Sequence, residues 1–169
     1  LPPRFRPLVH LAKLPGSMHL MARLMRSSLF TRSPLAFGHL TLRGLTEAER
    51  IRWSTPLRTD AGVRHDLRKA FRGVHNRYTL EAATHFADVE QPVLVLWGGS
   101  RNAFSLRLGE RLAADLPNAR LEVVRESSAF LPLDAPEAMA AAIDRFIADV
   151  AAGGPLSAGA TGEEGLATR

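Results

Sequence analysis

The sequence predicts an α/β fold in which a helical first part is followed by a short parallel sheet and its covering helices. Apolar residues recur at helical spacing through much of the first ninety residues. After Pro92 the pattern changes to a continuous apolar run closed by two glycines, which is typical of a strand buried on both faces of a parallel sheet. A strand, helix, strand, helix order follows as far as about residue 150, and this order is typical of a parallel α/β sheet.

Short amphipathic helices are predicted in the first ninety residues. An apolar stripe between Leu8 and Phe30 is divided into two short helices by Pro15-Gly16. The segment from Thr46 to Glu49 has the form of a capping box and predicts a helix over Glu47–Thr55, with Trp53 on one of its faces. Further amphipathic helices are predicted at residues 60–72 and 79–86.

The second half contains the elements of the sheet. Strands are predicted at 93–97 and 120–124, and a helix at 106–116 lies between them. Asp134 and Glu137 are expected to cap a last helix. The apolar stripe of that helix comprises Met139, Ile143, Phe146, Ile147 and Val150. Residues 151–169 are rich in Gly, Ala, Ser and Thr, which predicts a disordered tail.

Composition narrows the class of protein. Of the 169 residues, 46% are hydrophobic and 23% are charged, as in soluble globular proteins. No apolar run approaches the roughly 18 to 20 residues that a membrane span needs. The absence of cysteine excludes disulfides, thiolate nucleophiles and cysteine-ligated zinc, and leaves the cytoplasm as the default location. Two strands are too few for a stable doubly wound sheet, and the chain starts at Leu1 without a signal-peptide pattern, so we expect a fragment whose other strands lie upstream.

Charge is divided unevenly along the chain. Residues 1–77 hold 15 Arg and Lys against 4 Asp and Glu, whereas residues 78–169 hold 7 against 13. A basic half can bind nucleic acid, but the aromatic residues expected of a base-stacking surface are not interleaved with the charges. Opposite charges on the two halves also favour docking of one half on the other or on missing chain. We therefore expect no nucleic-acid partner and no membrane partner, and the oligomeric state stays open.

Three segments together resemble the C-terminal part of a known enzyme family. Pro92–Gly98, Glu110–Val124 and Phe130–Glu137 are similar to the last two strands and their connections in α/β-hydrolases of the haloalkane dehalogenase and epoxide hydrolase type. In that family a helical cap precedes these strands. The resemblance implies a helical cap at residues 1–90, a hydrolase core at 91–150 and a tail at 151–169.

The resemblance also implies a catalytic triad of nucleophile, acid and histidine. The nucleophile elbow of the family precedes the cap, so it is expected upstream of Leu1. The acid position, three residues after the glycine that ends the first strand, holds Arg101, and the histidine position holds Ala129. No histidine follows His85, so a small shift of the alignment does not supply the base. The hypothesis is a family branch with altered or lost chemistry, since alanine cannot move a proton.

Other residue patterns suggest other sites. Gly98-Gly99-Ser100-Arg101-Asn102 nearly matches the G-x-S-x-G elbow, and its glycines also suit a tight turn or a phosphate cradle. Basic residues at helical spacing form either an anion-binding face or a solvated one; they are Arg64, Arg68, Lys69 and Arg72. The histidines lack the spacing of a metal site and are expected on the surface or in loops; they are His10, His19, His39, His65, His75 and His85.

The resemblance gives the leading functional expectation. The full-length protein is expected to hydrolyse an ester, an epoxide or a carbon–halogen bond without metal or organic cofactor. Trp53, Phe71 and Phe86 are the candidates for the cap surface that faces a small-molecule substrate. Two alternatives stay open: a non-catalytic protein of the same fold that binds a small apolar ligand, and a basic interaction module built on the first half.

Overall fold

The computed structural model describes residues 6–100 and 104–153. These residues form mixed helix and strand, with 57% helix and a two-stranded parallel sheet. The chain divides into two compact units, which we describe separately. The helical unit comprises Leu1–His39 and Arg43–Leu80, and the sheet unit comprises Leu40–Leu42 and Glu81–Arg169.

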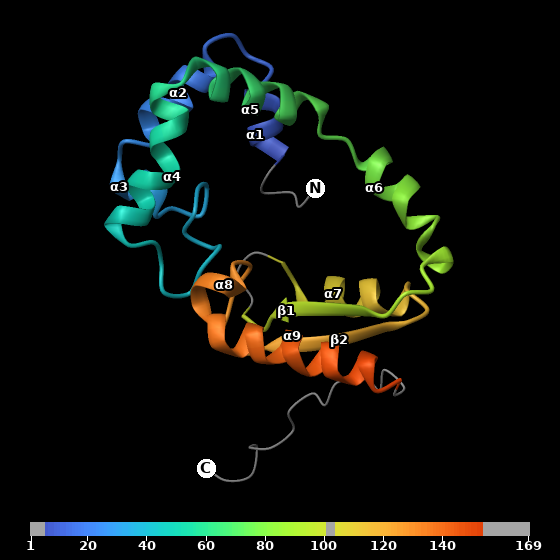
Figure 1. Ribbon diagram of the computed structural model, residues 1–169. Helices are drawn as coiled ribbons and strands as arrows, with labels where there is room; N and C mark the ends of the chain where they lie inside the picture. Colours follow the sequence, from blue (N-terminus) through green and yellow to red (C-terminus); the bar gives the residue numbers. More distant parts are fainter. Residues whose placement is uncertain (1–5, 101–103, 154–169) are drawn as a thin grey trace. The chain divides into compact units, whose positions relative to one another are not determined.

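Figure 1 shows the elements in chain order. They are α1 (Arg6–Leu11), α2 (Ser17–Leu24), α3 (Ser28–Thr31), α4 (Glu47–Thr59), α5 (Ala61–Gly73), α6 (Asn76–Ala83), the 3-10 helix η2 (Phe86–Asp88), β1 (Val93–Gly98), α7 (Leu106–Ala114), β2 (Ala119–Val124), α8 (Leu131–Asp134) and α9 (Pro136–Ala151). None of the helices in the described ranges is long and apolar enough to cross a membrane.

A small apolar core joins α2, α4 and α5 in the helical unit. Met21, Ala22 and Leu57 form its buried centre. The partly buried residues packed against them are Leu11, Met25, Phe30, Val63 and Leu67. The predicted break at Pro15-Gly16 is confirmed, because Gly16 precedes α2 with φ of 76°, a left-handed conformation that glycine adopts without strain.

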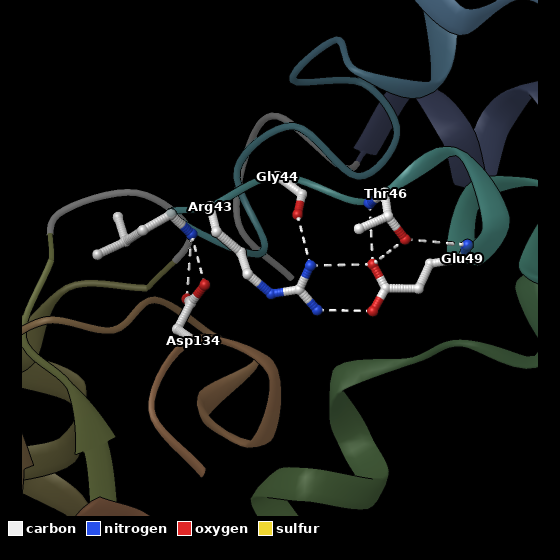
Figure 2. Close-up of polar contacts among 6 residues, drawn as sticks. Arg43, Gly44, Thr46, Glu49 and Asp134 are labelled. Atoms are coloured by element: carbon white, nitrogen blue, oxygen red, sulfur yellow. Dashed lines mark hydrogen bonds and ion pairs between the residues drawn. The ribbon is translucent and has the colours of Figure 1, made fainter. Parts of the chain in front are cut away.

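The predicted capping box at the start of α4 is confirmed. The Glu49 backbone N–H donates to Thr46 Oγ1 (3.3 Å), and the Thr46 backbone N–H donates to Glu49 Oε2 (2.9 Å). Arg43 adds two hydrogen bonds to the same carboxylate, at 3.0 and 2.6 Å, as Figure 2 shows. The helix passes the predicted end at Thr55 and continues through Pro56 to Thr59, so the expectation of an end before the proline was wrong.

The network around Glu49 makes the helical unit sensitive to acid. Hydrogen bonds from Arg43, then from Thr46, lower the pKa of Glu49 from its ordinary value of 4.5 to about 2. Because the folded pKa is depressed, the stabilisation is complete above about pH 4.5 and is lost as the pH falls towards 2. We expect the melting temperature of Glu49→Gln to lie below that of the wild type at pH 7, with the gap closing between pH 4.5 and 2.

A matched control isolates this effect from a general loss of charge. Asp66 is an exposed carboxylate on α5 that forms no ion pair within the described residues. Asp66→Asn removes the same charge from the same unit, and its melting temperature should follow that of the wild type across this range. A gap for Glu49→Gln that did not change with pH would contradict the assignment.

The sheet unit is built on one pair of parallel strands. β1 and β2 pair in register from Val93 opposite Ala119 to Gly98 opposite Val124. Figure 1 shows α7 and α9 on opposite faces of this pair. Helix α7 packs closely against β1 because Gly109 faces the ring of Trp97. A Cβ added at Gly109 would lie 2.7 Å from a carbon of that ring. The arrangement agrees with the predicted strand, helix, strand, helix order and with an α/β class.

Ion pairs join α9 to the strand β2. Arg120 pairs with Asp149 and Glu122 pairs with Arg145, and the Arg120 guanidinium also lies 5.3 Å from the centroid of the Phe146 ring. This corrects the predicted apolar stripe of the last helix. Ile147 is 59% exposed and Val150 is 37% exposed, whereas Ala142 is fully buried. Met139, Ile143 and Phe146 of the stripe are partly buried, so the prediction fails for its last two residues, and the fully buried position of α9 is the small Ala142.

Candidate functional site

The candidate site lies where the two parallel strands end. Gly98 ends β1, and a Cβ at this position would lie 2.2 Å from the carbonyl oxygen of Ser128. Only glycine lets the loop after β2 approach the strand so closely. The Ser100 backbone N–H then donates to the Ser127 carbonyl oxygen (3.1 Å), and the Gly99 N–H donates to the Val124 carbonyl oxygen (2.8 Å). The two glycines thus join the loops that follow β1 and β2.

Asp134 fixes the second of these loops. Its carboxylate accepts from the backbone N–H of Ser128 (2.8 Å). It also accepts from the backbone N–H of Leu42, at 2.9 and 3.0 Å to its two oxygens, and Figure 2 draws these two bonds to Asp134. The Phe130 N–H donates to the Leu40 carbonyl oxygen (2.8 Å). The prediction that Asp134 caps the last helix was wrong, because the N-cap of α9 is Ala135, without a side-chain cap, and the carboxylate binds these two amides instead.

A pocket of about 140 Å³ opens between these loops. Its apolar lining comes from Leu96, Trp97, Phe104 and Leu131, and its other lining residues are Gly98, Ser100, Ser128 and Ala129. An apolar cavity of about this volume is large enough for one benzene-sized group. No lining residue in the described part of the chain is ionisable, so the pocket is suited to an uncharged, mainly apolar group.

The structure describes only some of the residues at the expected catalytic positions. Ala129 lines the pocket. Arg101 lies outside the described residues. The Ser100 hydroxyl donates to the Arg125 carbonyl oxygen (3.4 Å), and no histidine lines the pocket. His85 contacts Asp88 (3.3 Å), with both side chains exposed. The pocket therefore has space and apolar walls but, in its described lining, no group that exchanges protons near neutral pH.

The candidate substrate-binding aromatic residues are not among the described residues that line this pocket. Trp53 on α4 is 37% exposed and meets Phe37 edge to face, with ring centroids 5.6 Å apart. Phe71 on α5 is partly buried, and Phe86, also partly buried, begins η2. Trp53 and Phe71 belong to the helical unit and Phe86 to the sheet unit. Their role in substrate binding stays a prediction.

Residue patterns missed part of the site. Trp97 was predicted as strand and Ser128 was not singled out, yet both line the pocket. The signals in the sequence were the Gly98–Asn102 pattern, which includes Gly98 and Ser100 of the lining, and the resemblance that singled out Ala129 in the loop after Val124. Within the described residues no group of three or more His, Cys, Asp or Glu could hold a metal ion.

Comparison of the chain with family models, curated proteins and solved structures gives no significant match.

Proposed function

We propose that this chain is the C-terminal part of an α/β-hydrolase-fold protein whose full-length form hydrolyses an ester, an epoxide or a carbon–halogen bond. The observation that supports the proposal best is the position of the pocket, because open parallel sheets bind ligands at the carboxyl ends of their strands. Helices on both faces of a parallel pair also suit a larger parallel sheet, which would add strands beside β1 or β2.

In this proposal the pocket holds the apolar part of a substrate. Trp97, Phe104 and Leu131 surround that group and exclude water from it. The buried Ser128 and the half-buried Ser100 supply polar atoms beside it. The nucleophile and the proton acceptor come from chain other than the lining described above, since Ala129 and the serines beside it do not offer a base.

A specific observation favours a second candidate, a non-catalytic protein of the same fold that binds a small apolar ligand. The described lining combines apolar walls with uncharged serines and contains no ionisable side chain. Such a lining binds a small uncharged molecule without any catalytic group. Binding and turnover therefore have to be measured separately.

Filling the pocket tests both candidates. Ala129→Leu adds three carbons to a pocket of about 140 Å³ and is expected to lower kcat/KM for p-nitrophenyl butyrate, styrene oxide or 1-chlorobutane about tenfold or more in the full-length protein. Ala148→Leu, on an exposed part of α9, makes the same change and should leave kcat/KM as it was. Turnover that Ala129→Leu did not affect would remove the pocket from the mechanism.

Ligand binding decides between the two candidates if no turnover is found. Trp53→Phe leaves Trp97 as the single tryptophan, so p-nitrophenol binding in the pocket would quench its fluorescence. Quenching that Ala129→Leu abolishes, without hydrolysis of any substrate, supports the non-catalytic candidate. Neither quenching nor hydrolysis would overturn both.

A further inference from the structure

A second cavity, in the helical unit, is lined by cations. It measures about 300 Å³ and is lined by residues of α2 and just after it, of the C-terminal end of α4 and of the first turn of α5. Its lining residues that can carry a positive charge are His19, Arg23, Arg26, Arg58 and Arg64. Among the described residues, the rest of the lining is Ala22 and Thr59. Four arginines around one cavity repel one another unless an anion lies between them.

The carboxylates of the helical unit do not offset this charge. Glu49 is bound by Arg43 and Thr46, and Glu47 is bound by Arg50. Asp60 accepts from the backbone N–H groups at the start of α5, and Asp66 does not line the cavity. None of the arginines of the cavity takes part in an ion pair with another described residue. The described lining of the cavity therefore carries a net positive charge and contains no carboxylate.

One of these arginines, Arg64, is held in place by hydrogen bonds, and another, Arg58, is partly buried. Arg64 donates through Nη1 to the Leu57 carbonyl oxygen (3.0 Å) and to the Arg58 carbonyl oxygen (3.2 Å), at the C-terminal end of α4. The Nε atom of Arg58 is buried and has no hydrogen-bond partner among the described residues. A buried N–H donor without an acceptor costs free energy, so the position of Arg58 is not explained by hydrogen bonds of its Nε within the described residues.

We propose that this cavity binds a small phosphorylated ligand through a di- or polyphosphate group. Arginine guanidinium groups donate pairs of parallel hydrogen bonds, which suits the tetrahedral oxygens of phosphate. Thr59, whose hydroxyl donates to the Thr55 carbonyl oxygen (2.9 Å), lines the same cavity without adding charge. A neighbouring cavity of about 220 Å³ shares His19 and Arg64 with the cavity of 300 Å³ and is also lined by His65 and Arg68. The cationic lining therefore continues beyond a single phosphate position.

Calorimetric titration of the whole chain with inorganic pyrophosphate tests the proposal. Saturable one-to-one binding is expected, weakened by added salt because the attraction is between charges. Arg58→Gln should weaken it about tenfold or more, since a charge-assisted hydrogen bond and a cation are lost together. Arg52→Gln is the matched control: Arg52 also lies on α4, is exposed and does not line the cavity, so its loss should change Kd by less than about twofold.

A second variant and a second ligand complete the experiment. Arg23→Gln/Arg26→Gln changes exposed residues of the same cavity and should also weaken binding about tenfold or more if Arg58→Gln impairs folding. A short DNA duplex, titrated in parallel, represents the phosphates of nucleic acid. Absence of pyrophosphate binding would overturn the proposal. A second result would also overturn it: the duplex binds more tightly than pyrophosphate, and Arg52→Gln and Arg58→Gln weaken this duplex binding equally.

Discussion

Replacing Gly98 with alanine is expected to destabilise the sheet unit by about 3 kcal/mol or more, the upper end of the cost of overpacking a protein interior. The added Cβ would lie 2.2 Å from the Ser128 carbonyl oxygen and 2.9 Å from the Ser127 carbonyl oxygen. Both neighbours are backbone atoms of a loop, so a change of side-chain rotamer cannot relieve the clash. Urea unfolding followed by Trp97 fluorescence, in a Trp53→Phe background, measures the loss.

Gly73→Ala is the control for the Gly98 variant. Nothing lies within 4 Å of a Cβ added at Gly73, and the residue ends a helix without a positive φ. Its free energy of unfolding is expected to stay equal or to rise slightly, because alanine favours helix more than glycine does. Equal stability of the wild type and Gly98→Ala would show that the loop after β2 does not approach the strand as described.

Asp134→Ala is expected to cost about 2 to 3 kcal/mol, because hydrogen bonds to a charged acceptor contribute about 1.5 to 3 kcal/mol each. The Ser128 amide belongs to a residue that is only 1% exposed, so water replaces the lost carboxylate poorly. The Leu42 amide is exposed and should contribute less. Hydrogen exchange should therefore accelerate at Ser128 and at the Phe130 amide, which bonds to the Leu40 carbonyl oxygen.

A second acidic residue separates this role from a change in net charge. Asp144 lies on an exposed part of α9 and has no hydrogen-bond or ion-pair partner within the described ranges. Asp144→Ala should leave both the free energy of unfolding and the exchange rates close to those of the wild type. Faster exchange at Ser128 in both variants would contradict the role assigned to Asp134.

The sequence predicted the elements of the fold where the signal is local. The capping box at Thr46 and the break at Pro15-Gly16 depend on neighbouring residues, and both are confirmed. The predictions for Asp134 and Ile147 were wrong because their contacts are not local in the sequence. Asp134 has the sequence pattern of a helix cap, but its carboxylate accepts a hydrogen bond from an amide 92 residues away. The exposure of Ile147 depends on how α9 packs against β2, to which it is joined by ion pairs.

The candidate site was predictable in part. The resemblance directed attention to Ala129, which lines the pocket, and to Arg101, which lies outside the described residues. Trp97 and Ser128 enter the lining because Gly98 permits a close loop contact, and this depends on the tertiary arrangement. Helical spacing could not predict the cationic cavity either, because the cavity combines Arg23 on α2 with Arg58 on α4 and Arg64 on α5.

The placement of Leu40–Leu42 in the sheet unit affects how that unit folds. Its hydrogen bonds to Phe130 and Asp134 close a loop of about ninety residues, so they are gained only after a large loss of chain entropy. We therefore expect the β1–α7–β2 segment to form first and the contacts of Leu40–Leu42 to form late. A polypeptide cut just before Glu81 would keep both strands but lack this final step, so the two units are not separable by a single cut.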